Sequence, residues 1–417
     1  MKKLLSLMAA VAMVSFLTAC GDDDSPAPVG GNDSNNVVVT ENVTENTTWT
    51  ADNIYELAGR IAVESGATLT IEAGTVIKGQ AGTGSNATAL LVARGAKLNA
   101  EGTASAPIIF TSVADEIESG MIASPNLDPD LNGLWGGVII LGNAPISADA
   151  ASVQIEGIPP SDANGLYGGS DAADNSGSIR YISIRHGGAN IGEGNEINGL
   201  TLGGVGTGTT IEYVEVVGNQ DDGIECFGGT VDISNALVWN QGDDAYDMDQ
   251  DYTGTIDNFI FIGGVDSDHA MELDGPEGAQ DNGGFTLRNG SLKGYNDDEV
   301  AGGEYIDFRS GVKATIQNCY FFNFSQDSDV ELDNDGVAAN WLDESLNVSG
   351  LEFNVSHLSA GNLTIADIFA DKGDDANDAF ATRAPGASVV TTATVGADKS
   401  RFSGWTWADA NGELASF

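Results

Sequence analysis

Five short segments of the chain carry an acidic residue at the same position between two apolar ones. They read DDGIECF (221–227), DDAYDMD (243–249), DHAMELD (268–274), GEYIDFR (303–309) and SDVELD (328–333). The shared acids are Glu225, Asp247, Glu272, Asp307 and Glu331, and further acids follow two positions later at Asp249, Asp274 and Asp333. If these segments are neighbouring strands, the carboxylates face one another, which is destabilising while all of them are ionised. Either their pKa values rise or a cation lies among them.

Carboxylate oxygens at this density are the ligands that Ca²⁺ prefers, so the eight acids are candidate ligands of a calcium site. The alternative is a solvated acidic face, because the chain has 62 Asp and Glu against 16 Lys and Arg. The resulting net charge of −46 argues against a nucleic-acid partner. His186, His269 and His357 have no Cys or second His at metal spacing, which argues against zinc.

The same region has a loose resemblance to the polygalacturonases. NQDDG, GDDA, SDHA and FRSGVK follow the order of that family's Asn-x-Asp-Gly, Gly-Asp-Asp, Gly-His-Gly and Arg-x-Lys motifs. The resemblance implies a catalytic group of Asp222, Asp243, Asp244 and His269, with Arg309 and Lys313 holding a polysaccharide substrate. Glycoside cleavage needs two carboxyl groups about 5–9.5 Å apart, one of them protonated. The sequence departs from the family because no Gly flanks His269 and because Arg309 and Lys313 are four residues apart instead of two.

A repeated pattern of short strands must position these acids. The repeats are SIRYISIRH (178–186), TIEYVEVVG (210–218), DISNALVWN (232–240), TIDNFIFIG (255–263), TLRNGSLKG (286–294), TIQNCYFFN (315–323) and NVSGLEFNV (347–355). Each has apolar residues at its second and seventh positions, and four have Asn at the fourth: Asn235, Asn258, Asn289 and Asn318. Constant internal offsets with variable spacing between units are typical of a solenoid with insertions in its turns. We therefore predict an all-β fold, a right-handed parallel β-helix, with the Asn side chains stacked in a hydrogen-bonded ladder.

Several longer stretches resemble a family of bacterial secreted β-helix lipoproteins within the pectate-lyase-like group. They are GLTLGGVGTGTTIEYVEVV, DDGIECFGGTV, GDDAYDMDQDYTG and YGGSDAADNSGSIRYISI. The resemblance covers residues 47–417 and implies the fold, but most members of the family have no assigned function, so it implies no activity.

The start of the chain has the features of an export signal. Lys2 and Lys3 precede an apolar run that ends in Leu-Thr-Ala-Cys20, which resembles the lipobox of bacterial lipoproteins. We therefore expect a signal peptide over 1–19 and a flexible tether over 20–46 that begins at an acylated Cys20 in the outer membrane. Whether the protein lies on the surface or the periplasmic side stays open. A β-helix over 47–359 and a cap over 360–417 follow.

Three functions fit these features. The first is an anchored protein that binds a carbohydrate, a surface protein or another extracellular ligand with Ca²⁺ and without catalysis. The second is a polysaccharide-cleaving enzyme that uses the acidic ladder, and the third is a rigid spacer.

Two further features of the sequence lie outside the ladder. Cys226 and Cys319 lie in apolar patterns and are expected to be buried free thiols. Asp128-Pro-Asp-Leu-Asn-Gly133 matches the first half of an EF-hand loop, but its twelfth position is Ile139.

Overall fold

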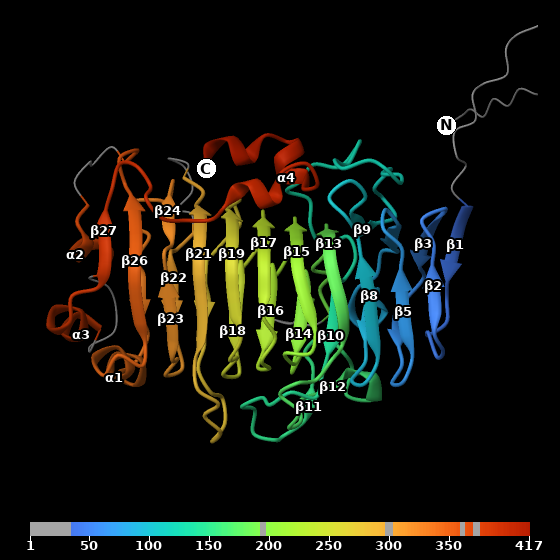
Figure 1. Cartoon of the computed structure of the whole chain (residues 1–417), viewed down its shortest axis with the longest axis horizontal. Helices are drawn as coiled ribbons and strands as arrows, with labels where there is room; N and C mark the ends of the chain where they lie inside the picture. The colour runs from blue at the N-terminus through green and yellow to red at the C-terminus, as the bar shows by residue number, and fades with distance from the viewer. Residues whose placement is uncertain (1–34, 192–196, 297–302, 359–362, 370–375) are drawn as a thin grey trace, which may run out of the picture. The chain divides into compact units, whose positions relative to one another are not determined.

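The computed structural model describes residues 35–191, 197–296, 303–358, 363–369 and 376–417. Over these residues the chain winds through two long parallel sheets, coil upon coil (Figure 1). Each coil passes from a strand of the larger sheet through a turn to a strand of the smaller one and back. A strand therefore pairs with the equivalent strand of the next coil, as β16 does with β18 and β17 with β19. The predicted all-β parallel β-helix is confirmed.

The two sheets hold most of the described strands. The smaller sheet consists of β4 (Arg60–Val63), β7 (Ala89–Val92), β10 (Val138–Leu141), β14 (Leu200–Gly203), β16 (Ile224–Phe227), β18 (Tyr246–Asp249), β20 (Glu272–Leu273), β22 (Ile306–Phe308) and β25 (Val330–Leu332). The larger sheet consists of β1 (Asn35–Val39), β2 (Thr47–Trp49), β3 (Asn53–Leu57), β5 (Thr68–Ile71), β6 (Val76–Gly79), β8 (Lys97–Glu101), β9 (Ile108–Ser112), β13 (Gly177–Arg185), β15 (Thr210–Val217), β17 (Ile233–Trp239), β19 (Thr255–Ile262), β21 (Phe285–Lys293), β23 (Ala314–Gln317), β24 (Tyr320–Phe322), β26 (Asn347–Asn354) and β27 (Gly386–Val389). A small hairpin, β11 (Val153–Gln154) with β12 (Leu166–Tyr167), lies in the excursion that follows β10.

The apolar columns of the repeats form the core. Ile179, Ile211, Ile233 and Ile256 are direct partners in successive coils, and each is at most 1% exposed. β-Branched side chains suit such stacking because they pack well on a pleated surface. Burial of each one contributes roughly 1.5–3 kcal/mol. Cys226 and Cys319 are buried free thiols, as expected.

The fourth position of each repeat is a bend in the long strands. Tyr181, Tyr213 and the four Asn residues all have positive φ angles between 48° and 62°, a conformation that Asn tolerates better than most residues. The Asn ladder is present in two pieces: Asn258 donates to Asn235 (2.7 Å) and Asn318 to Asn289 (3.3 Å). Between the pieces Asn289 donates to Asp257 instead (2.7 Å).

The β-helix begins earlier than the sequence predicted. β1, which falls within the expected tether 20–46, pairs in parallel with β3 over five residues. Residues 35–46 therefore belong to the fold, because the run Asn-Asn-Val-Val-Val extends the sheet by one more strand. The expected signal peptide 1–19, Cys20 and the rest of the expected tether lie outside the described residues.

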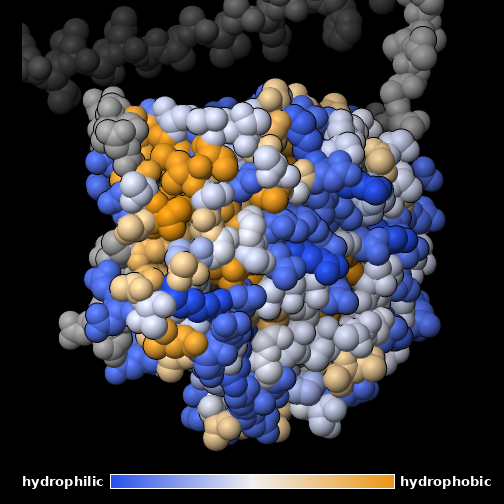
Figure 2. Space-filling view, turned by 60° about the vertical axis from the view of Figure 1, so that its left-hand side comes forward, coloured by the Kyte–Doolittle hydropathy of each residue, from blue (hydrophilic) through white to orange (hydrophobic). Residues whose placement is uncertain are grey.

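The C-terminal region divides into two parts with different positions. Helices α1 (Asp335–Leu342), α2 (Ile365–Ile368) and α3 (Ala376–Thr382) lie at the end of the coil stack, where Trp341, Phe369 and Phe380 pack edge to face. Figure 2 brings this end forward and shows apolar residues gathered over its upper part, with a largely hydrophilic surface around them.

The last part of the chain is a strap that runs back across the coils. It comprises residues 390–417 and includes η3 (Lys399–Phe402), α4 (Trp407–Ala410) and η4 (Glu413–Ser416). Trp405 and Trp407 pack with Val217, Trp239 and Ile260 on strands in the middle of the solenoid, and α4 lies over these strand ends in Figure 1. The expected cap over 360–417 is therefore wrong for this part of the chain, because Trp405 and Trp407 cover strands in the middle of the solenoid. The apolar side chains of β15, β17 and β19 that face away from the core are buried by this contact with the strap.

None of the helices in the described residues is both long and apolar enough to span a membrane.

Candidate functional site

The acidic ladder consists of Glu225, Asp247, Glu272, Asp307 and Glu331. Each member is the direct partner of the next in the parallel register of β16, β18, β20, β22 and β25. The same position holds Leu91, Ile139 and Thr201 in the three preceding strands. The ladder therefore starts abruptly at β16, which makes it a local feature of the second half of the sheet.

A second column stands beside it in the turns that lead into these strands. This turn ladder comprises Asn198, Asp222, Asp244 and His269. The backbone N–H of Asp222 donates to Asn198 Oδ1 (3.2 Å), that of Asp244 to Asp222 Oδ1 (2.9 Å), and that of His269 to Asp244 Oδ1 (2.7 Å). Asp222 and Asp244 are buried. Each therefore fixes the turn of the next coil, a structural role that period-two alternation does not indicate.

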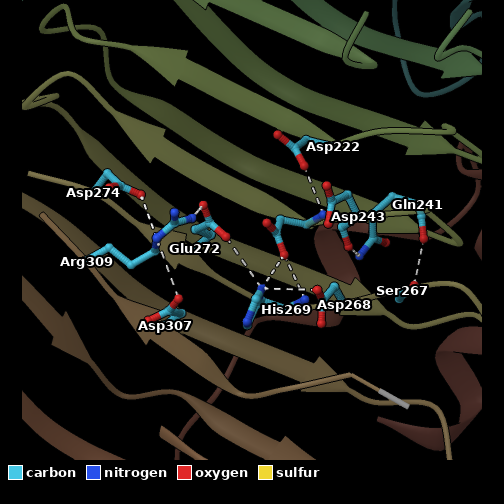
Figure 3. A network of polar contacts seen from close by, with 11 residues as sticks. Asp222, Gln241, Asp243, Ser267, Asp268, His269, Glu272, Asp274, Asp307 and Arg309 are labelled. Carbon is cyan, nitrogen blue, oxygen red and sulfur yellow. Dashed lines mark hydrogen bonds and ion pairs between the residues drawn. The ribbon is translucent and has the colours of Figure 1, made fainter. Parts of the chain in front are cut away.

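Two cations compensate the acids of the third and fourth coils (Figure 3). His269 Nδ1 lies 2.8 Å from Asp244 Oδ1 and 3.7 Å from Glu272 Oε2. The Arg309 guanidinium contacts Glu272, and its Nε lies 3.8 Å from Asp274 Oδ2 and 3.7 Å from Asp307 Oδ2. Glu272, Asp274 and Asp307 thus have protein cations as partners.

Three acids of the first two coils have no such partner among the described residues. Asp222, Glu225 and Asp247, here called the Asp247 cluster, offer carboxylate oxygens within 4.8 Å of one another. Glu225 accepts a hydrogen bond from the Asn198 carboxamide, but no Lys, Arg or His of the described residues forms an ion pair with the cluster. Asp247 Oδ1 is buried without a hydrogen-bond partner, and Asp247 also belongs to a group with Glu272 and Asp274. The uncompensated negative charge is therefore centred on Asp247.

The remaining residues singled out from the sequence lie around these two ladders. Asp243 is exposed at the edge, within 4.8 Å of Asp222. Lys313 pairs with Asp281. Asp249 accepts from the backbone N–H of Gln250 (2.7 Å).

At the far end of the ladder the expected ligands separate. Asp333 is exposed and accepts from the Asn334 side chain (3.2 Å). Glu331 lies in a group with Glu304 and Asp329, whose ligand atoms are within 4.8 Å of one another. Glu304 and Asp329 were not singled out from the sequence, although both stand directly before the strands of the ladder. Asn198 was missed as well, because the strand that follows it carries Thr201 in place of the shared acid.

The chain matches the family model described as a pectate-lyase-like beta helix domain over residues 41–408. It belongs to this family. No curated protein and no solved structure matches the chain significantly. The family assignment establishes the fold of this β-helix domain.

Burial raises the pKa values of acids in both halves of the ladder of this β-helix domain. Burial raises the pKa values of Asp222, Glu225 and Asp247 well above the usual range, and neighbouring carboxylates raise them further. Burial also raises the pKa of Asp307 to about 7, although the charge of His269 opposes the rise. These carboxyl groups therefore hold protons at pH values where ordinary ones are ionised.

His269 is charged at neutral pH. Burial lowers its pKa, but the hydrogen bond and charge of Asp244 outweigh this effect and raise it to about 9. A protonated imidazole with this pKa is a poor general base near pH 7. The site can thus take up cations or protons in the Asp247 cluster. The positive charges of His269 and Arg309 lie on the following two coils.

Proposed function

We propose that this β-helix domain is a non-catalytic binding protein that takes up Ca²⁺ in the Asp247 cluster. The cation would be held by carboxylate oxygens of Asp222, Glu225 and Asp247, with Asp221 and Asp243 at its rim. The observation that carries the proposal is the buried Asp247 Oδ1, which has no hydrogen-bond donor; carboxylate oxygens of Asp247, Asp222 and Glu225 lie within 4.8 Å of one another, and none of the three acids forms an ion pair in the described residues. A hard divalent cation compensates such a group, because oxygen ligands at high charge density are what Ca²⁺ prefers.

The proposed ligand set is smaller than the one expected from the sequence. Of the eight acids expected there, Glu272, Asp274 and Asp307 contact Arg309, so we leave them out of the proposed set. Glu225 and Asp247 stay in the proposed set, and Asp222 joins them from the turn ladder. The ligand of the loaded protein would be a carbohydrate or a surface protein that completes the coordination of the ion. We place the protein at the outer membrane through an acylated Cys20.

The melting temperature with and without Ca²⁺ tests the cation site. An ion that binds only the folded state at 100 times its Kd stabilises it by about 2.7 kcal/mol. Ca²⁺ should therefore raise the melting temperature of the wild type, and Asp247→Asn should remove most of the rise. Asp333→Asn, which changes an exposed acid outside the cluster, is the matched control and should keep it. Equal melting curves in chelator and in Ca²⁺ would show the ladder to be a solvated face of a spacer protein.

The anchor has its own test. Cys20→Ser should leave the protein unprocessed or freely soluble, because stable anchoring of a lipoprotein needs several acyl chains. Membrane fractionation measures this, and a variant that still sediments with the outer membrane would contradict the anchor.

The alternative function is polysaccharide cleavage, and one observation favours it. Burial raises the pKa of Asp222, as a general acid requires, and the neighbouring Asp244 lies 2.8 Å from His269 Nδ1. Both, however, accept backbone N–H groups of the next coil, which accounts for their presence without catalysis. Release of reducing sugar by the wild type, lost in Asp222→Asn, would establish the enzyme.

A further inference from the structure

A cavity of about 550 Å³ lies where the long strands end, apart from both ladders. Its floor is formed by the turns after β17, β19 and β21, including Asn240 and Tyr295. One wall is the loop with Asp128 and Asp130, and the other is the end of the strap, with Asn411 and Glu413. The half EF-hand motif of the sequence is thus one wall of a pocket.

The motif is held in place through its backbone, which leaves its acids free to face solvent. The Leu131 N–H donates to the Asp128 carbonyl (3.2 Å), and the Leu131 carbonyl lies 2.6 Å from His186 Nδ1. Gly133 N–H donates to the Gly187 carbonyl (2.6 Å). Asp128 and Asp130 are exposed. The loop is therefore a fixed wall that carries two carboxylates at the pocket mouth.

The lining groups indicate the class of ligand. Carboxylates accept hydrogen bonds and carboxamides both donate and accept them, which suits a ligand rich in hydroxyl groups. Tyr295 is half-buried in the lining, and aromatic rings pack against the C–H surfaces of sugar rings. Lys293 is paired with Glu413 (3.2 Å), so the pocket is net negative and disfavours acidic polymers.

We propose that this cavity binds a short uncharged oligosaccharide, whose hydroxyl groups meet Asp128, Asp130 and the Asn carboxamides while one ring packs on Tyr295. The site goes beyond the proposed function, because it shares no lining residue with the Asp247 cluster and needs no cation. Its volume falls within the range of small-molecule pockets, roughly 300–1,000 Å³.

Calorimetry and saturation-transfer NMR with short glucan, mannan, xylan and galactan fragments test the proposal. At least one fragment should bind the wild type equally in chelator and in Ca²⁺. Tyr295→Ala and Asp130→Asn should each weaken it about tenfold, which corresponds to ~1.4 kcal/mol. Asp52→Asn, an exposed acid in the first coils, should bind as the wild type does.

The outcomes separate this site from the cation site. Binding that persists in Asp247→Asn and falls in Tyr295→Ala supports the cavity, whether or not Ca²⁺ binds the ladder. The proposal is overturned if no fragment binds, if Tyr295→Ala and Asp130→Asn bind like the wild type, or if binding requires Ca²⁺ and is lost in Asp247→Asn. Circular dichroism of each variant excludes misfolding as the cause of a loss.

Discussion

Removal of one carboxyl group from the acidic ladder should stabilise the protein, but only at high pH. Asp307 has an ordinary pKa of 3.8 that is raised in the folded chain to about 7. Its side chain is 13% exposed, so solvent screens it little. Below pH 3.8 the group is protonated in both states and costs nothing. As pH rises through the folded pKa, the unfolded chain releases its proton more readily, and the folded state loses stability.

The size of the effect follows from the shift. About three pKa units at about 1.4 kcal/mol each set an upper limit of about 4 kcal/mol. Asp307→Asn removes the titration and keeps the shape, so it should raise the free energy of unfolding by about 2–4 kcal/mol at pH 8. At pH 4 the variant should unfold within about 0.5 kcal/mol of the wild type, because this pH lies only just above the ordinary pKa and little of the penalty has developed.

Equilibrium urea unfolding in chelator at the two pH values measures this difference. Asp333→Asn serves as the control, since its exposed carboxylate should change stability little at either pH. Equal effects of Asp307→Asn at both pH values, or a loss of stability at pH 8, would refute the reasoning that burial raises the pKa of Asp307.

Three further predictions concern the turn ladder, the strap and catalysis. Asp244→Asn removes the charge that faces the cationic His269 and should lose part of the stability, whereas Asp244→Leu should lose about 2 kcal/mol more, because it also leaves the half-buried His269 N–H unpaired. Thermal melts compare the two variants, and equal losses would contradict the backbone role. Trp407→Ala should lower the free energy of unfolding in urea by about 3–5 kcal/mol, because it uncovers Trp239 and the buried Arg185 guanidinium. An unchanged unfolding midpoint would show that the strap contributes little to stability. Reducing-sugar assays on acidic and neutral polysaccharides should show no cleavage by the wild type, and any release lost in Asp222→Asn would refute the non-catalytic account.

The sequence predicted the register of the acidic ladder correctly for a physical reason. In a β-helix with constant internal offsets, one alignment of the repeats places every apolar residue inside, and a slip of one residue would turn them out. The pairing of Glu225 with Asp247, and of each later acid with the next, follows from that alignment.

Burial at the turns could not be predicted in this way. The side chains of Asp222 and Asp244 are 7% and 4% exposed, and they accept hydrogen bonds from the backbone of the next coil. Their direction depends on turn geometry, which period-two alternation does not determine. The strap is a similar case, since the contact of Trp407 with Trp239 joins residues far apart in the sequence.

Calorimetric titration of the chelated protein with Ca²⁺ at pH 7, in buffers with different heats of ionisation, tests the central claim most directly. Because the Asp247 cluster holds protons through its raised pKa values, binding of Ca²⁺ should release protons, and the affinity should increase with pH. Asp247→Asn should abolish both the binding and the proton release, while Asp333→Asn should keep them. Binding that releases no protons, or that survives Asp247→Asn unchanged, would contradict a cation site in this cluster.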